Sequence, residues 1–144
     1  MIVYNNDEIQ MPIFPKRKIT KWIKLTSLKF NKRVGDISYI FCSDEKILEI
    51  NNQYLNHNYY TDIITFDYSE NNIISGDIFI SIDTVKSNSK KYGTKYLNEL
   101  YRVIIHGILH LCGIDDKNPV QRTVMEEKEN SSLLDLKELL DLNN

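Results

Sequence analysis

Apolar and polar residues alternate along the first half of the chain in a pattern that predicts short strands and two helices. Residues 2–4 and 37–41 show the two-residue alternation of half-buried strands, and residues 62–66 and 77–82 are predicted as two further strands. Pro15 is placed to start a helix between the first two strands. The predicted buried face of this helix carries Ile19, Trp22, Ile23, Thr26 and Phe30. Residues 43–45 open a second helix, whose apolar face carries Ile47, Leu48 and Ile50.

The second half of the chain is predicted to be mostly helical. Asp83 is placed to cap one helix, and a further helix repeats apolar residues at helical spacing up to Cys112. Asn118 and Pro119 mark the start of a closing helix with a leucine-rich face. Polar residues 69–75 are predicted to form the most mobile loop. Together these elements predict an α+β fold over residues 1–144, a single small domain in which a mixed sheet of about four strands packs with about five helices.

Length and composition fit a single domain with one buried core. The chain has 144 residues, of which 42% are hydrophobic. No stretch approaches the roughly 18 to 20 apolar residues that cross a membrane, and the amino terminus lacks the charged and apolar segments of a secretion signal. Cys42 and Cys112 lie in different predicted elements, which favours reduced core thiols over a disulfide framework. We therefore expect a cytoplasmic protein without membrane contact.

The net charge of −2 conceals an uneven distribution of charge along the chain. Residues 9–35 hold eight basic residues and no acidic one, whereas the chain from Glu126 onward holds six acidic residues and two lysines. A basic helix can follow a phosphate backbone, but it can equally be an ordinary solvated surface. The candidate RNA-binding residues fall into two groups, one in the first helix and one before the helix that ends at Cys112: Lys21, Lys24 and Lys32, then Lys86, Lys90, Lys91 and Lys95.

The strongest chemical signal is a pair of histidines, His106 and His110, near the end of the predicted helix. Because they are four residues apart, both imidazoles lie on one helical face, about 40° apart. Gly113 is placed to end the helix in a left-handed conformation and to return Asp115 or Asp116 to the histidine face. Histidine nitrogens and a carboxylate are ligands that zinc accepts, so the pattern predicts a three-ligand metal site with an open position.

Two other interpretations of the histidine pair are considered. Two histidines can simply pack in a core, but Gly107 and Gly113 lower helix propensity without benefit to such a helix. Zinc proteases also place two histidines four residues apart, and there a glutamate directly follows the first histidine and acts as general base. Here that position is Gly107, so the metal geometry is kept while the protease base is missing.

The segment from His106 to Asp116 resembles the signature H-G-x-L-H-L-x-G-Y-D-H of the YbeY endoribonucleases, which are ribosomal RNA maturation factors. Two upstream segments are also similar to motifs of this family: residues 61–66, T-D-I-I-T-F, and residues 76–81, G-D-I-F-I-S. The resemblance covers residues 50–129 closely and the rest of the chain more loosely. It implies one Zn²⁺ per chain, held by His106, His110 and Asp116.

The chain departs from the family pattern at two positions. The third ligand of the family is a histidine, and Asp116 replaces it here, six residues after His110. A carboxylate also binds zinc, but its negative charge makes the bound water a weaker acid and attracts phosphate less strongly. The adjacent Asp115 is expected to stabilise the turn by accepting backbone hydrogen bonds. Leu55 stands where the family motif N-x-x-Y-R has its arginine, so phosphate contacts of that arginine are missing.

Three further residues are weighed for roles near the metal. Arg102 is a candidate catalytic residue that binds a phosphate in place of the missing arginine, and Glu99 is a candidate hydrogen-bond acceptor for a ligand imidazole. The two residues could instead form a solvated pair at helical spacing, which we favour for Glu99. His57, in a polar loop after Leu55, is expected to have no role.

The resemblance implies a zinc-dependent endoribonuclease specific for single-stranded RNA, which acts in 3′-end maturation of 16S rRNA and in ribosome quality control. Its partners would be ribosomal RNA and the ribosome or its small-subunit proteins. One alternative is a ribosome-associated binding protein with a structural metal, and another is a different metallohydrolase. Three ligands rather than four favour a catalytic site.

Overall fold

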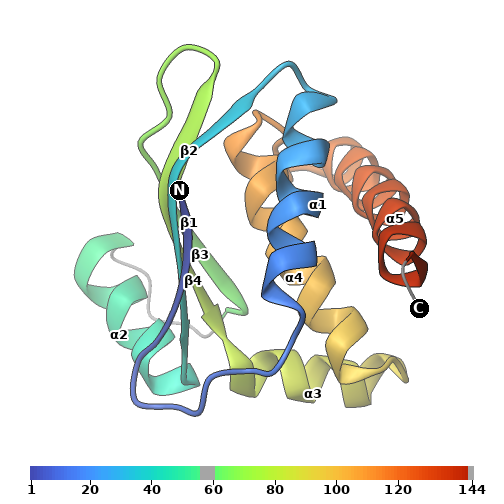
Figure 1. The fold of residues 1–144 in the computed structure, drawn as a ribbon. Helices are drawn as coiled ribbons and strands as arrows, with labels where there is room; N and C mark the ends of the chain where they lie inside the picture. Colours follow the sequence, from blue (N-terminus) through green and yellow to red (C-terminus); the bar gives the residue numbers. More distant parts are fainter. Residues whose placement is uncertain (56–60, 143–144) are drawn as a thin grey trace.

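The computed structural model describes residues 1–55 and 61–142, and it has an α+β architecture (Figure 1). Four strands form one mixed sheet: β1 (Ile2–Asn6), β2 (Arg33–Cys42), β3 (Ile63–Asp67) and β4 (Ile73–Ser81). Their order in the sheet is β1-β2-β4-β3. β1 and β4 both run parallel to β2, whereas β3 pairs with β4 as an antiparallel edge strand.

Five helices surround the sheet in the described residues: α1 (Lys16–Leu28), α2 (Asp44–Leu55), α3 (Ile82–Tyr92), α4 (Tyr96–Leu111) and α5 (Pro119–Asp141). α1 and α4 pack on one face of the sheet, and α5 packs on both of these helices, farther from the sheet (Figure 1). α2 lies alone on the opposite face (Figure 1). The number of strands and helices and the mixed sheet agree with the sequence prediction.

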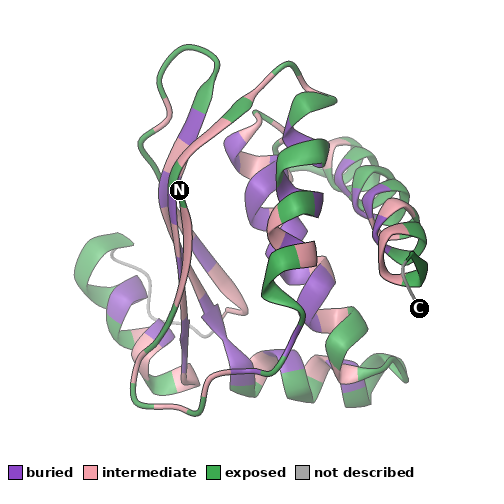
Figure 2. Ribbon diagram, in the orientation of Figure 1, coloured by how far each residue is buried: buried purple, intermediate pink, exposed green. Residues whose placement is uncertain are grey.

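α4 is the most deeply buried helix: nine of its sixteen residues are buried, and purple covers much of its ribbon in Figure 2. Its apolar face packs with α1 and the sheet in the larger of two core clusters, where Trp22, Ile78 and Ile104 are fully buried. A smaller cluster, which includes Cys42, lies under α2. The indole N–H of Trp22 donates a hydrogen bond to the Ser132 carbonyl oxygen at 2.7 Å and so joins α1 to α5. α4, which carries both histidines, therefore packs against the sheet on one side and against α5 on another.

The prediction for β4 and the loop before it was wrong in its boundaries. β4 begins at Ile73, and Ile82 already belongs to α3, so the expected strand over residues 77–82 was placed too late. The cause is a tight turn: the Glu70 and Ile73 backbones bond to each other, and the Tyr68 N–H donates to the Ser75 carbonyl oxygen at 2.9 Å. Small polar residues in this turn interrupt the hydrophobic pattern, so the pattern does not show where the strand begins. The loop before the strand is therefore shorter than predicted.

The residue that caps α3 also differs from the prediction. The Ser81 side chain accepts a hydrogen bond from the Thr84 N–H at 3.3 Å, so Ser81, not Asp83, caps the helix. The Asp83 carboxylate instead accepts a bond from the Asp44 N–H at 3.0 Å, at the start of α2. Asp83 therefore accepts a capping type of hydrogen bond, but it does so at the start of α2 and not in its own helix.

Candidate metal centre

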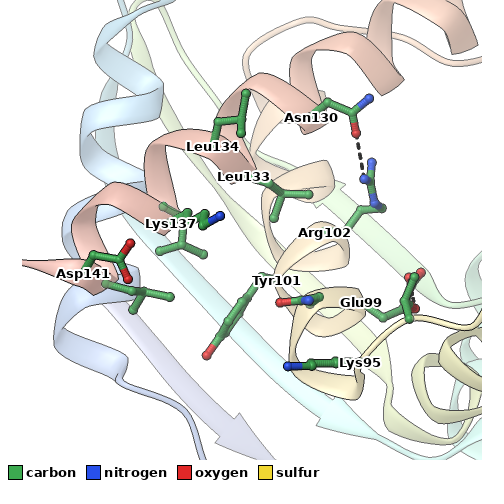
Figure 3. Close-up of a pocket in the computed structure, with 13 residues that line it drawn as sticks. Lys95, Glu99, Tyr101, Arg102, Asn130, Leu133, Leu134, Lys137 and Asp141 are labelled. Carbon is green, nitrogen blue, oxygen red and sulfur yellow. Dashed lines mark hydrogen bonds between the residues drawn. The ribbon is translucent and has the colours of Figure 1, made fainter.

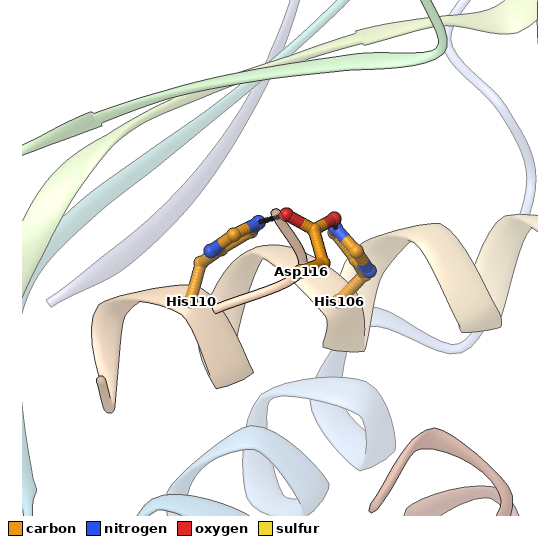
Figure 4. Close-up of side chains that lie close together, drawn as sticks. All are labelled: His106, His110 and Asp116. Atoms are coloured by element: carbon orange, nitrogen blue, oxygen red, sulfur yellow. Dashed lines mark ion pairs between the residues drawn. The ribbon is translucent and has the colours of Figure 1, made fainter. Parts of the chain in front are cut away.

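The metal-binding side chains come from the last two turns of α4 and the turn that follows it. The buried face of α4 points to the core, which leaves His106 and His110 half-buried on another face. Gly113 adopts φ +100°, as predicted, and its N–H donates to the His110 carbonyl oxygen at 2.9 Å. This reversal brings Asp116 back to the two imidazoles (Figure 4).

The three side chains form the one group of potential metal ligands found in the described residues, with their ligand atoms within 4.8 Å of one another. The His106 Nε2 and His110 Nε2 atoms each lie 3.3 Å from an Asp116 carboxylate oxygen, on opposite sides of that group (Figure 4). Ligand atoms of a tetrahedral zinc site, with bonds of roughly 2.0–2.2 Å, are separated by about 3.4 Å. The two histidine–carboxylate distances are close to this value, and the donor set could hold a metal ion.

Glu129 of α5 holds the first histidine in place. Its Oε2 atom lies 2.6 Å from His106 Nδ1, and its Oε1 atom accepts a hydrogen bond from Arg102 at 2.8 Å. A second guanidinium nitrogen of Arg102 donates to the Asn130 side-chain oxygen at 2.7 Å. Because Nδ1 is engaged with a carboxylate, the Nε2 atom of His106 faces Asp116 and is available to a metal. Glu129 thus takes the role for which Glu99 was a candidate.

The environments of the two imidazoles shift their pKa values in opposite directions. Burial disfavours the charged form of His106, but the hydrogen bond to Glu129 and its charge outweigh burial, and the pKa of His106 is raised. Burial and the adjacent His106 charge lower the pKa of His110. A metal binds the neutral form of an imidazole. Protons therefore compete with a metal mainly at His106.

Two of the three candidate ligands, His106 and Asp116, line a cleft of about 460 Å³ between the end of α3, the middle of α4 and the first half of α5. Ten residues line it: Tyr92, Thr94, Glu99, Arg102, His106, Asp116, Arg122, Met125, Glu126 and Glu129. A second cavity of about 760 Å³ lies between α4 and α5, and Arg102 lines both cavities. Figure 3 shows Arg102 at the edge of this second cavity, with its guanidinium turned to Asn130. The metal centre is therefore accessible from one side through the first of these clefts.

The residue after the first histidine is Gly107, and its surroundings leave little space for the glutamate that acts as general base in zinc proteases. A Cβ atom at this position would lie 3.1 Å from the Ile78 side chain and 3.2 Å from that of Ile63. The position faces the sheet, away from the cleft, so a carboxylate there would be buried among apolar side chains. The arrangement has no room for the protease base.

We expect Gly107→Glu to destabilise the fold by about 3 kcal/mol or more, because it overpacks the contact with the sheet and buries an unpaired carboxylate. Urea unfolding monitored by circular dichroism measures this loss. Thr123→Glu, at an exposed position on α5, is the matched control and should leave the free energy of unfolding within about 0.5 kcal/mol. A variant at Gly107 as stable as the control would show that α4 does not pack on the sheet as described.

The structure also places the other residues that the sequence singled out. Asp115 is exposed, and within the described residues it makes none of the backbone hydrogen bonds expected of it. Both cysteines are free: Cys42 is buried and Cys112 half-buried. Leu55 ends α2 and is partly exposed. His57 lies outside the described residues.

The candidate RNA-binding lysines lie in two regions of the chain, one on and after α1 and the other on and after α3. Six of the seven are exposed and Lys32 is half-buried. The residues that line the metal-side cleft come from α3, α4, α5 and the segments beside them, and none comes from α1. Lys91 stands next to the cleft residue Tyr92, whereas Lys29, just after α1, pairs with Asp135 of α5. The second basic group is therefore the one adjacent to the candidate metal centre.

The fold and site define a class of single-domain α+β proteins with a metal centre of two histidines and a carboxylate at the end of a central helix. The sequence profile of the family described as Endoribonuclease YbeY matches residues 2–137. The chain belongs to this family.

Relatives agree with this assignment, and a solved structure has a similar fold. A protein of Bacteroides fragilis named Endoribonuclease YbeY is 60% identical over 132 residues, which cover 92% of this chain and 95% of the relative. A protein of the same name from Parabacteroides distasonis is 59% identical over 137 residues, covering 95% and 96%. The solution structure of TM1509 from Thermotoga maritima is similar in fold, with a TM-score of 0.65, 25% identity and coverage of 94% and 89% of the two chains. In the part of the chain that the structure describes, no helix is long and apolar enough to span a membrane.

Proposed function

We propose that this chain is a zinc-dependent endoribonuclease that cleaves single-stranded RNA and acts in the 3′-end maturation of 16S rRNA and in ribosome quality control. The observation that carries the proposal is the cluster of His106, His110 and Asp116 at an open cleft, in a chain of the YbeY family. Three protein ligands leave a position open, as catalytic zinc sites do. This favours catalysis over a purely structural metal.

Each residue of the site has a defined part in this proposal. His106, His110 and Asp116 would hold one zinc ion per chain. When bound, zinc supplies Lewis acidity at the phosphodiester and lowers the pKa of water. Glu129 fixes the tautomer and orientation of His106 through the Nδ1 contact. The negative charge of Asp116 reduces the attraction of the site for phosphate, so cationic side chains of the cleft have more to contribute.

Arg102 was predicted to bind phosphate, and the structure gives it a second candidate role. Its guanidinium is bound to Glu129 and Asn130, and the Glu129 carboxylate offsets its charge. An arginine held in this way positions Glu129, and through Glu129 it positions His106. That Arg102 also contacts phosphate stays a prediction.

Purified protein loaded with zinc should cleave unstructured RNA, leave a duplex of the same sequence intact, and lose activity when a chelator removes the metal. In cells without the protein, mapping of ribosomal RNA ends should show 16S rRNA that is extended at its 3′ end. Normal 3′ ends in such cells would remove the proposed ribosomal role. Absence of any metal-dependent cleavage in vitro would remove the proposed activity.

Reversing the charge of each basic group separately tests which of the two groups binds RNA. Lys90, Lys91 and Lys95 replaced by glutamate should weaken RNA binding and reduce the slope of its salt dependence by about 0.7 for each phosphate that is no longer neutralised. The same change at Lys21 and Lys24 of α1 and at Lys32 after it is the comparison. We expect a smaller effect from this set, because only Lys91 and Lys95 are direct sequence neighbours of cleft residues. A larger effect from the α1 set would move the RNA-binding face to α1.

A further inference from the structure

Tyr92 and Arg122 line the metal-side cleft and have no part in holding the metal. Tyr92 is the last residue of α3, and its side chain lines the cleft while 62% of the residue stays exposed. The Lys91 ammonium lies over the Tyr92 ring, 5.4 Å from its centre, which places positive charge on one face of an exposed ring. An exposed tyrosine ring offers apolar surface on which another planar group can stack.

Arg122, in the first turns of α5, lines the same cleft and is exposed. Within the described residues its guanidinium forms no ion pair and no hydrogen bond. Glu126 lines the cleft one helical turn away, but it does not pair with Arg122 either. Arg102, the other arginine of the cleft, is already bound by Glu129 and Asn130. Of the two arginines in the cleft, Arg122 is therefore the one that remains available to an anion.

We propose that Tyr92 and Arg122 bind one nucleotide of single-stranded RNA next to the phosphodiester at the metal centre, with the base stacked on Tyr92 and a phosphate on Arg122. This inference rests on the proposed ribonuclease function. A stacking surface combined with a cation is the chemistry by which proteins hold unpaired nucleotides without reading a duplex. Arg122 also supplies a phosphate contact to a chain that has Leu55 at the position of the family's arginine.

The test measures binding of fluorescein-labelled oligoribonucleotides of about five nucleotides by fluorescence anisotropy, in chelator so that no cleavage occurs. Tyr92→Ala should weaken binding about five- to tenfold, and Tyr92→Phe should restore it, because the ring supplies the stacking surface. Arg122→Gln should weaken binding and lower the salt slope by about 0.7. An oligomer that lacks the base at the stacked position should bind Tyr92→Ala and the unchanged protein equally well.

Matched controls separate this proposal from effects on folding. Tyr68→Ala removes a tyrosine of similar exposure, 59%, on the hairpin, and Arg33→Gln removes an exposed arginine that does not line the cleft. If Tyr92→Ala and Arg122→Gln bind RNA as their controls do while the unchanged protein cleaves RNA, the nucleotide subsite is wrong and the proposed function stands. If the unchanged protein neither binds nor cleaves RNA, the proposed function itself fails.

Discussion

Alanine at His106 or at His110 is expected to abolish stoichiometric zinc binding while the protein stays folded. Each change removes one of three ligands, so the loss of affinity should exceed the roughly 100-fold that supporting residues contribute. Both histidines are only half-buried, and alanine favours the helix, so the fold should tolerate either change. Zinc content by mass spectrometry and far-ultraviolet circular dichroism measure the two effects.

The two neighbouring aspartates provide the control for this result. Asp116→Ala should lose zinc as steeply as the histidine variants, and Asp115→Asn should lose little, because only Asp116 approaches both imidazoles. Asp116→His should retain the metal, since it restores the ligand set of the family signature. Equal losses at Asp115 and Asp116, or zinc retained by both histidine variants, would refute this ligand set.

Glu129→Ala should lower zinc affinity by about 10- to 100-fold, although Glu129 is not a ligand. The loss arises because His106 would no longer be held by its Nδ1 contact, which spans 2.6 Å. Glu129→Gln keeps an oxygen that can accept the bond, so it should recover part of the affinity. Lys128→Ala, at an exposed position on the same helix, should leave affinity unchanged. Zinc titration with a competing chelator measures all three variants.

The pH profile separates positioning from a general loss of structure. Burial lowers the pKa of His106, but Glu129 outweighs burial and raises it. A raised pKa means that protons displace a metal at higher pH than they would from an ordinary histidine. In Glu129→Gln the acid limit of zinc binding should therefore move to lower pH, even though affinity at neutral pH is reduced. An unchanged acid limit would show that Glu129 only fills space.

Local sequence signals predicted that His106, His110 and Asp116 come together, because the three residues lie within eleven positions of the chain. Helical spacing places His106 and His110 on one face, and Gly113 ends the helix where the left-handed turn is required. Neither feature depends on how distant parts of the chain pack. The same reasoning counted the strands and helices correctly, since each has its own hydrophobic period.

The residues that hold these ligands in place could not be predicted from local sequence signals. Glu129 is 23 residues from His106, and their contact depends on how α5 docks on α4. One signal did exist: Glu129 falls at helical spacing between the buried residues Met125 and Leu136, so a carboxylate occupies the apolar stripe of its helix. A charged residue on a buried face requires a partner. For Arg102 a role near the metal was predicted, but its partners were not.

The way α5 is attached has a consequence for heat tolerance. Only four residues along its 23-residue length are buried, and one of them is Glu129. A helix with so little buried surface can detach in a local opening whose free energy is smaller than that of global unfolding. Each such opening would release His106 from its carboxylate while the sheet and α4 remain intact. On heating, the affinity of the enzyme for zinc should therefore fall at a temperature at which the backbone amides of its strands are still protected from hydrogen exchange.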